Sequence, residues 1–347
     1  MKEKVILGMS GGVDSSVAAY LLKEKGYEVI GISLNQQADS LAQDLDDARE
    51  IARSLGIQHH IINIYEEFED KVVSYFVDSY NRGETPSPCV ICDDEIKFKI
   101  LFEMAEKYGA EYVATGHYTS VAYCKKFSKY LLKAVHNIIK DQSYMLYRLE
   151  SKKLERLLFP LQDYSKAEIR EIARKIGLSV HNKKDSQGIC FAKEGYKEFL
   201  AGRLKDNIKT GNYIDKFGNI LGQHKGYQFY TVGQRRGLGI NFSKPVFITE
   251  IKTQTNEIVL GEFSELLTDR VELLNYKFST DIDSLIGIEL LARPRFSSTG
   301  FLGKLHLEDE KLYFKYEKAN AHNTDGQHLV LFYENFVLGG GIIRRTR

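Results

Sequence analysis

The chain has 347 residues, 43% of them hydrophobic and 27% charged, with a formal net charge of +1. This composition is typical of globular proteins and excludes collagen-like, coiled-coil and wholly disordered chains. No apolar run approaches the roughly 18 residues that a membrane helix needs. The first apolar run, from Val5 to Met9, is too short for the core of a signal peptide. We therefore expect a cytoplasmic protein of two or three domains.

The near-neutral net charge conceals a strong asymmetry along the chain. Residues 34–111 hold 7 Lys and Arg against 17 Asp and Glu, a net charge of −10. Residues 112–253 hold 26 Lys and Arg against 12 Asp and Glu, a net charge of +14. The basic middle third indicates a polyanionic partner such as nucleic acid. The alternative is a set of solvated helix faces that point in different directions.

Strand and helix patterns alternate over the first 115 residues. Short apolar runs predict strands at 4–9, 27–34, 59–64 and 112–115. Apolar residues at helical spacing between them predict helices at 14–25, 41–55, 68–80 and 95–108. This alternation is typical of βαβ units, so we expect an α/β domain with a doubly wound parallel sheet.

The pattern changes after one more helix, predicted at 165–177 from the capping box of Ser165 and Glu168. Beyond about residue 205 glycines become frequent, and short β-type runs follow at 227–232, 246–251, 257–260, 311–316 and 328–333. We expect three parts: the α/β domain at 1–200, a small β-rich connecting domain at 201–263, and a C-terminal β-barrel at 264–347.

A glycine-containing loop lies between the first predicted strand and the first predicted helix. Its sequence is Ser10-Gly11-Gly12-Val13-Asp14-Ser15-Ser16. Glycines let backbone amides approach an anion, and the helix N-terminus adds its positive dipole. Nucleotides bind at this place in βαβ units. The alternative is a tight turn with an N-capping Ser or Asp. A carboxylate beside phosphate calls for Mg²⁺ between them, so we expect Asp14 to bind this metal.

The loop differs from the commoner nucleotide-binding loops. The chain has no G-x-x-x-x-G-K-[ST] string, which argues against γ-phosphate chemistry, and no G-x-G-x-x-G after the strand. The string instead resembles the pyrophosphate (PP) loop of the N-type ATP pyrophosphatases. That resemblance implies cleavage of ATP between its α- and β-phosphates and adenylation of a substrate oxygen.

Four cysteines, Cys89, Cys92, Cys124 and Cys190, are too few for a disulfide scaffold. Cys89 and Cys92 form a C-x-x-C in a loop stiffened by Pro86 and Pro88. We expect Cys92 at the N-terminus of the following helix, where the pKa of a thiol is lowered, although the neighbouring carboxylates oppose this. A structural zinc site is disfavoured because no second C-x-x-C or paired His follows. Cys124 lies on a predicted strand, where a small buried side chain is the expected role.

Seven motifs together extend over the chain: G-M-S-G-G-V-D-S-S at 8–16, T-P-S-P-C-V-I-C-D-D-E-I-K-F at 85–98, A-T-G-H-Y at 114–118, K-D-Q-S-Y at 140–144, K-K-D-S-Q-G-I-C-F at 183–191, G-Q-R-R-G-L-G at 233–239 and L-G-G-G-I-I at 338–343. With these motifs the whole chain resembles the tRNA-specific 2-thiouridylases, which put sulfur on the wobble uridine of tRNA.

This resemblance implies roles for particular residues. It assigns ATP to Gly8, Met9, Ser10, Gly11, Gly12, Val13, Asp14, Ser15, Leu34 and Gly116. It assigns a persulfide to Cys190, and to Cys92 the role of the partner thiol that can form a disulfide with it. It assigns contacts with tRNA to Ser87, Pro88, Cys89, Lys140, Asp141, Gln142, Arg295 and Phe296. The alternative for residues 140–142 is a solvated turn. The alternative for residues 295–296 is an ordinary pair of strand residues with Phe296 in the barrel core.

The implied reaction is ATP-dependent and uses Mg²⁺, with tRNA and a sulfur donor such as a cysteine desulfurase or a sulfur-relay protein as partners. Adenylation turns the uracil O2 into part of a good leaving group, and sulfur from the Cys190 persulfide replaces it with help from Cys92.

The chain departs from many relatives at Cys89, where they have Asp. Three thiols would allow a [4Fe–4S] cluster, which we do not favour. The rival functions are another adenylating enzyme of this superfamily, such as a different tRNA thiolase, and a non-catalytic RNA-binding protein.

Overall fold

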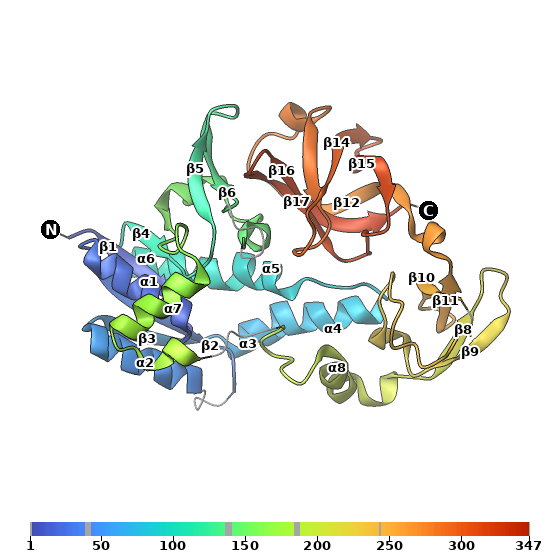
Figure 1. The fold of residues 1–347 in the computed structure, drawn as a ribbon, viewed down its shortest axis with the longest axis horizontal. Helices are drawn as coiled ribbons and strands as arrows, with labels where there is room; N and C mark the ends of the chain where they lie inside the picture. Colours follow the sequence, from blue (N-terminus) through green and yellow to red (C-terminus); the bar gives the residue numbers. More distant parts are fainter. Residues whose placement is uncertain (1, 39–42, 136–140, 184–187, 243, 347) are drawn as a thin grey trace. The chain divides into compact units, whose positions relative to one another are not determined.

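The structure is a computed structural model that describes residues 2–38, 43–135, 141–183, 188–242 and 244–346. The chain, drawn as a ribbon in Figure 1, divides into two compact units, each assembled from several stretches of sequence. Unit 1 comprises Met1–Val72, Cys89–Ser186 and Asn335–Leu338. Unit 2 comprises Val73–Pro88, Gln187–Glu334 and Gly339–Arg347.

A five-stranded parallel sheet with the strand order β3-β2-β1-β4-β7 lies at the centre of unit 1. Its strands are β1 (Lys4–Gly8), β2 (Glu28–Asn35), β3 (Gln58–Asn63), β4 (Tyr112–Ala114) and β7 (Leu157–Leu158). Val5, Ile6 and Leu7 of β1 are all completely buried. The central strand is therefore covered on both faces, as is usual in a parallel sheet.

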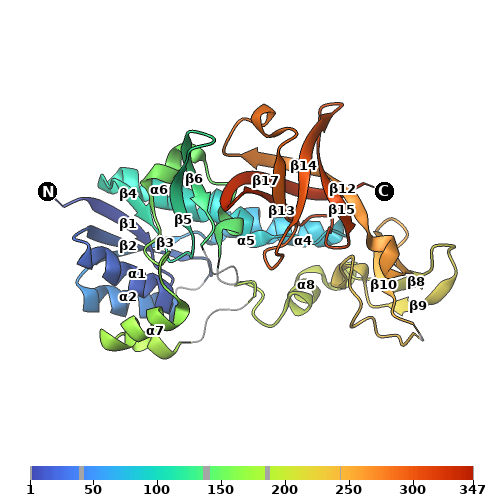
Figure 2. The same ribbon diagram turned by 45° about the horizontal axis from the view of Figure 1, so that its top comes forward.

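Helices cover this sheet, as the ribbon of Figure 2 shows. On one face, α1 (Val13–Glu24), α2 (Gln43–Leu55) and α7 (Lys166–Lys175) share a core with β1. On the other, α6 (Phe98–Tyr108) packs against β1 and β4. The predicted doubly wound α/β fold is confirmed, and the predicted helices at 14–25, 41–55 and 165–177 correspond to α1, α2 and α7.

Two predicted helices differ from the observed ones. The helix expected at 68–80 is divided into α3 (Tyr65–Phe68), a π-helical turn at Glu69–Val73, and α4 (Ser74–Asn81), which belongs to unit 2. The helix expected at 95–108 begins earlier, with α5 (Pro88–Cys92) and a π-helical turn, η2 (Asp93–Lys97). Pro88 begins α5 because its fixed φ and missing N–H suit the first helical position.

A hairpin of unit 1 contains the strand predicted at Cys124, but its pairing with a second strand was not predicted. It consists of β5 (Ser120–Cys124) and β6 (Lys129–Lys133), paired antiparallel. Cys124 ends β5 and is buried, as expected for a small core side chain.

Unit 2 holds a small mixed sheet with the strand order β10-β11-β8-β9. The strands are β8 (Gly211–Ile214), β9 (Ile220–His224), β10 (Phe247–Lys252) and β11 (Glu257–Gly261), and α8 (Tyr196–Leu204) precedes them. The predicted strand at 227–232 is wrong: Tyr227–Phe229 forms a 3₁₀ turn. Its aromatic residues fit a β pattern, but Tyr227, Phe229 and Tyr230 pack instead into the core beneath this sheet.

Six antiparallel strands form the predicted C-terminal barrel. In the order β12-β15-β14-β13-β16-β17 they close through pairing of β12 with β17. They are β12 (Thr268–Phe278), β13 (Glu289–Arg293), β14 (Phe301–Glu308), β15 (Lys311–Asn320), β16 (His328–Tyr333) and β17 (Phe336–Arg345). The domain limits at residues 200 and 263 stay predictions. None of the helices in the described ranges has the length and apolar character of a membrane span.

Candidate functional site

The glycine loop connects β1 to α1, as the sequence predicted. Gly11 has φ of +69°, and a Cβ there would lie 2.0 Å from the backbone O of Asp44, so only glycine fits. The Ser15 hydroxyl accepts a hydrogen bond from the N–H of Ser10 (3.1 Å) and donates one to the C=O of Gly12 (3.2 Å). The loop is thus fixed above the N-terminus of α1, where an anion is favoured by the helix dipole.

The other residues assigned to ATP lie at the carboxyl end of the same sheet. A Cβ on Gly116, just after β4, would lie 3.0 Å from the backbone N of Ser15. Gly116 therefore allows the segment after β4 to approach the first turn of α1 closely. Leu34 is half-buried near the end of β2. This is the sheet edge where ligands of doubly wound folds bind, and the adenosine contacts of Leu34 and Gly116 stay predictions.

Asp14 is held by two side chains that sequence reasoning did not assign to the site. The Lys166 ammonium lies 2.8 Å from Oδ1 and 2.7 Å from Oδ2 of Asp14. The Tyr118 hydroxyl donates a hydrogen bond of 2.7 Å to Oδ1. The Lys166 side chain is only 14% exposed. A cation therefore already neutralises this carboxylate beside the loop.

A second lysine connects the loop to α2. The Lys183 ammonium donates to the C=O of Gly11 (3.0 Å) and pairs with Asp44 (2.7 Å) and Asp47 (2.5 Å). Burial would raise the pKa of Asp47, but its hydrogen bonds with Lys183 and Gln43 outweigh burial and lower it. Asp47 therefore stays ionised, and the three charged groups brace the loop against the start of α2.

Cys92 ends α5 and is half-buried within a continuous helical stretch. The predicted position at a helix N-terminus is therefore wrong, because helix formation begins four residues earlier, at Pro88. A helix N-terminal dipole does not act on this thiol. The charged side chains of the following turn supply its electrostatic environment instead.

These side chains form a small polar cluster. Asp93 is buried and pairs with Lys97, and its other oxygen lies 3.8 Å from Nε2 of His117. Burial alone would lower the pKa of Lys97, but the negative charges of Asp93 and Cys92 outweigh it and raise the pKa. Burial, followed by the charge of Lys97, lowers the pKa of His117 to about 4. A permanent ammonium therefore lies near Cys92, and His117 is neutral at physiological pH.

Cys89 and Cys190 are both exposed, and all four cysteines, which lie in described parts of the chain, are thiols rather than half-cystines. The Cys92–Cys190 disulfide expected from the resemblance is not observed. Cys190 belongs to unit 2 and precedes Phe191. The ring centroid of Phe191 lies 5.3 Å from that of Phe76 and 5.1 Å from that of Phe199. Within the described ranges, no group of three or more His, Cys, Asp and Glu side chains is arranged to hold a metal ion.

The residues assigned to tRNA have different environments. Lys140 lies outside the described residues. Asp141 is buried and accepts from the Ser143 hydroxyl at 2.8 Å, while Gln142 accepts from the N–H of Tyr118 at 2.9 Å. Gln142 therefore stabilises the fold at Tyr118, and Asp141 stabilises the turn that begins at Ser143. Their contacts with tRNA stay predictions, as do those of Ser87, Pro88 and Cys89.

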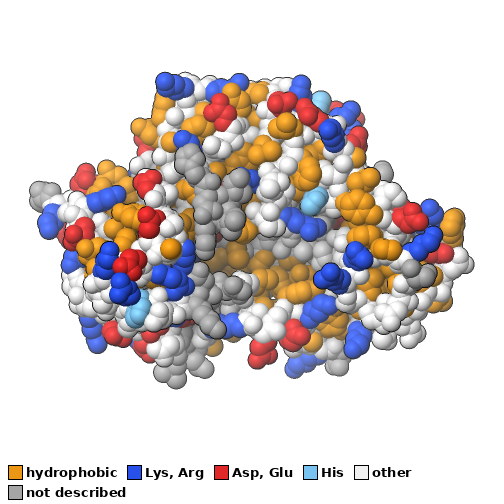
Figure 3. All heavy atoms as spheres, in the orientation of Figure 1, with side chains coloured by type: hydrophobic (Ala, Val, Ile, Leu, Met, Phe, Trp, Pro, Cys, Tyr) orange, Lys and Arg blue, Asp and Glu red, His pale blue; other side chains and the backbone are white. Residues whose placement is uncertain are grey.

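Arg295 and Phe296 lie in the connection between β13 and β14, not in a strand. Arg295 donates to the Thr324 hydroxyl at 2.7 Å. Phe296 is 37% exposed, so it is not the barrel-core side chain of the alternative interpretation. Exposed aromatic rings can stack on unpaired bases. On the face drawn in Figure 3, Lys and Arg side chains are interspersed with acidic and apolar ones.

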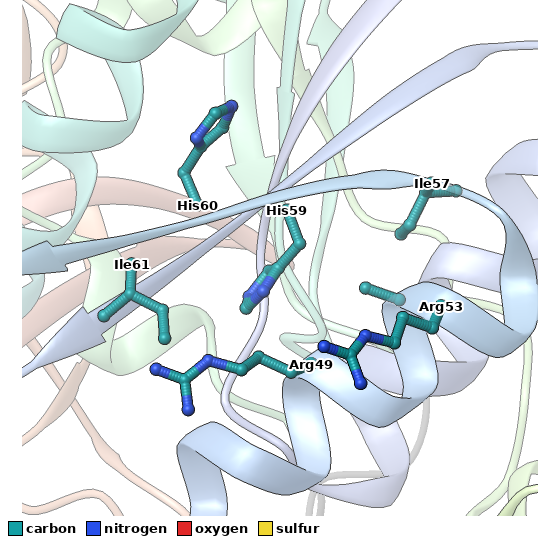
Figure 4. A pocket seen from close by; sticks show the side chains of 7 residues that line it. Arg49, Arg53, Ile57, His59, His60 and Ile61 are labelled. Carbon is teal, nitrogen blue, oxygen red and sulfur yellow. The ribbon is translucent and has the colours of Figure 1, made fainter. Parts of the chain in front are cut away.

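A hollow of about 470 Å³ lies elsewhere in unit 1, between α2 and β3 (Figure 4). It is lined by Arg49, Ala52, Arg53, Ile57, His59, His60 and Ile61, none of which was assigned to the site. His59 connects it to the loop: its Nε2 lies 2.8 Å from the Ser33 hydroxyl, which donates to the C=O of Met9. Burial, with the charges of Arg49 and His60, lowers the pKa of His59.

Comparisons with known proteins agree with these features. Residues 3–194 match the family described as the tRNA methyl transferase HUP domain, and residues 197–262 match the tRNA methyl transferase PRC-barrel domain. The chain is 69% identical to tRNA-specific 2-thiouridylase MnmA 2 of Fusobacterium nucleatum, over 99% of this chain and 100% of that protein. It is 40% identical to tRNA-specific 2-thiouridylase MnmA of Clostridioides difficile, over 100% of this chain and 99% of that protein.

Among solved structures, the chain is similar to a 4-thiouridine synthetase–RNA complex with bound ATP. The sequence identity is 21%, and the TM-score is 0.38 over 59% of this chain and 51% of that chain.

Proposed function

We propose that this chain, which belongs to the family of tRNA-specific 2-thiouridylases, uses ATP to replace the O2 atom of the wobble uridine of tRNA with sulfur. The observation that carries the proposal is the fixed loop of Gly11, Gly12 and Ser15 at the N-terminus of α1. It lies in the same unit as a half-buried cysteine with a cationic neighbour, Lys97.

The first step is adenylation. The uracil O2 attacks the α-phosphorus of ATP, and the bond to the β-phosphate breaks to release pyrophosphate. Backbone amides of the loop and the α1 dipole stabilise the charge that develops on the departing pyrophosphate. The O2 atom then belongs to AMP, which is a far better leaving group than oxide.

Mg²⁺ is part of this proposal, and the residues fit it. Asp14 has two hard carboxylate oxygens beside the loop, and the Lys166 ammonium that now contacts both of them supports a place where a cation is favoured. The ion would be held by Asp14 and would supply charge neutralisation at the phosphates.

Sulfur delivery uses the two cysteines. A cysteine desulfurase or relay protein donates sulfane sulfur, which makes a persulfide on Cys190. The Cys92 thiolate attacks the inner sulfur of this persulfide, so that hydrosulfide leaves and a Cys92–Cys190 disulfide forms. Hydrosulfide attacks C2 of the adenylated uracil, and AMP departs with the original oxygen. A thiol reductant then restores both cysteines.

The cluster alternative rests on the sequence of Cys89 alone, because no group of three or more His, Cys, Asp and Glu side chains in the described ranges is arranged to hold a metal ion. With Cys92 and Cys190, Cys89 provides three thiols, enough to hold a [4Fe–4S] cluster with one iron open to sulfide. Anaerobic purification with iron and acid-labile sulfide analysis separates the two. Full activity without iron excludes the cluster, whereas activity that follows iron content and is lost in Cys89→Ala requires it.

The adenylation step is tested by ATP–pyrophosphate exchange. We expect exchange of labelled pyrophosphate into ATP only when a tRNA with an unmodified wobble uridine is present. Exchange with a non-tRNA substrate would indicate another adenylating enzyme. The absence of exchange under all conditions, with tRNA binding intact, would indicate a non-catalytic RNA-binding protein.

A further inference from the structure

We infer that Lys166 belongs to the ATP-phosphate site: its ammonium neutralises Asp14 while the site is empty and binds the phosphates of ATP when the nucleotide is present. The inference rests on the proposed function, because it takes ATP as the ligand of the loop. It adds a residue far from the loop in sequence, and it gives Asp14 and Lys166 opposite effects on the affinity for ATP.

The first support is the place of the ammonium. Lys166 Nζ lies 2.7 and 2.8 Å from the two carboxylate oxygens of Asp14, which is the second residue of α1. The first turn of a helix is where backbone N–H groups bind an anion. The ammonium therefore lies beside the first turn of α1, the end of the helix that favours an anion.

The second support is how firmly α7 positions this lysine. Lys166 is the first residue of α7, and the capping box of Ser165 and Glu168 fixes the turn from which its side chain extends. Ile169 and Ala173 of α7 are completely buried in the core shared with α1. The helix thus holds the base of the Lys166 side chain against α1, and only the side chain itself needs to adjust to a ligand.

The third support is electrostatic. The carboxylate of Asp14 and a phosphate are both anions at the same helix end, so they repel each other unless a cation lies between them. A lysine ammonium has three donors on a flexible stem and can be shared by two anions. By contrast, Lys183 pairs with Asp44 and Asp47 and braces the loop, which is a structural role.

The test is equilibrium binding of ATP to the full chain, with EDTA and separately with Mg²⁺, in the absence of tRNA and sulfur donor. With EDTA we expect Lys166→Met to weaken ATP binding about tenfold or more, since a charge-assisted hydrogen bond is lost. We expect Asp14→Asn to leave it equal or tighter with EDTA, because a repulsive charge is removed. Lys166→Arg, which keeps the charge, should stay closer to wild type than Lys166→Met.

Lys175→Met is the matched control, because Lys175 lies on the same helix and pairs with Glu171 at the surface. It should bind ATP like wild type. If Lys166→Met does not fold, the double variant Asp14→Asn/Lys166→Met removes both members of the ion pair, and it is compared with Asp14→Asn alone. The double variant should bind ATP about tenfold more weakly than that single variant.

Wild-type affinity for ATP in Lys166→Met would overturn the inference. Equal weakening of ATP binding by Lys166→Met and Asp14→Asn with EDTA would also overturn it, because a purely structural ion pair predicts equal effects. Failure of the inference is distinguishable from failure of the proposed function. If the wild-type chain does not bind ATP at all, the proposed function fails. If it binds ATP but Lys166→Met binds equally well, only the inference fails.

Discussion

Cys92 takes its electrostatic environment from neighbouring side chains. It lies within the helical stretch that starts at Pro88, so the charge near its sulfur is the ammonium of Lys97 rather than a helix end. Cys190 is exposed and lies two residues after Gly188, which has φ of +81°. The more accessible thiol suits loading by a donor protein, and the enclosed thiol beside a cation suits attack on the persulfide.

This division of roles predicts different defects in two variants. After incubation with a cysteine desulfurase and cysteine, Cys190→Ser should carry no persulfide and transfer no sulfur. Cys92→Ser should accept the persulfide but fail to turn over, because the attacking thiolate is missing. Mass spectrometry of the intact protein measures the added sulfur atom as a mass increase of about 32 Da. Cys124→Ser is the control.

Equal persulfide loading of Cys190→Ser and Cys92→Ser would contradict these roles. Full turnover by Cys92→Ser would likewise exclude Cys92 as the group that releases the sulfur.

His117 provides a pH dependence whose sign follows from its environment. Its pKa is about 4 in the folded chain against 6.5 for an ordinary histidine. As the pH falls below 6.5, the unfolded chain binds a proton that the folded chain does not, so stability falls. Between pH 6.5 and pH 5 this residue should cost about 2 kcal/mol of unfolding free energy.

The measurement is thermal unfolding at both pH values for wild type and His117→Asn. The variant should lose less stability than wild type on acidification. Identical pH dependence of wild type and His117→Asn would contradict the low pKa of His117.

At the same scale, sequence reasoning found the loop residues but not the two lysines beside them. Gly11, Gly12 and Asp14 are recognisable because they are consecutive and follow a strand. Lys166 and Lys183 contact the loop across 152 and 172 positions of sequence. A lysine at the start of a helix carries no local signal for such a contact, since tertiary packing alone brings it there.

At the scale of elements, helices with clear caps were predicted well. The capping box at Ser165 fixed the start of α7 correctly, whereas Pro88 was interpreted as part of a loop although it begins α5. A proline fits both a stiff loop and a first helical turn, so its local sequence does not distinguish them. The strand predicted at 227–232 failed because its aromatic side chains are buried by tertiary packing.

The cap of α7 should matter for stability. Ser165→Ala removes the acceptor for the N–H of Glu168 and should lower the unfolding free energy by about 1 kcal/mol. Ser165→Thr keeps an acceptor and should lose less. Because α7 positions Lys166, Ser165→Ala should also weaken ATP binding slightly. Unchanged melting temperature in Ser165→Ala would show that the capping box contributes nothing measurable.

At the scale of the whole molecule, the order of segments along the chain does not predict which segments form each of the two units. The sequence predicted three parts that follow one another along the chain. In the structure, residues 73–88 belong to unit 2 although they lie between two segments of unit 1. Local patterns predict the type of each element well, but membership of a unit depends on contacts between residues that are far apart in sequence.

The charge asymmetry makes a prediction about tRNA binding. If the Lys and Arg residues of 112–253 contact the RNA backbone, the logarithm of the affinity should fall linearly and steeply with the logarithm of salt concentration. Lys140→Ala should reduce that slope by about one or less. Lys99 lies in the acidic stretch of residues 34–111 and pairs with Glu67, so Lys99→Ala should leave the salt slope unchanged. A flat salt response of the wild-type chain would contradict an electrostatic RNA interface.

The central claim is the reaction itself, and nucleoside analysis of the product tests it most directly. Unmodified tRNA is incubated with the wild-type chain, ATP, Mg²⁺ and a sulfide source, then digested and analysed by mass spectrometry. The account predicts 2-thiouridine at the wobble position, formed together with equal amounts of AMP and pyrophosphate. Consumption of ATP with sulfur at another atom or position of the tRNA, or with no thiolated nucleoside at all, would contradict it.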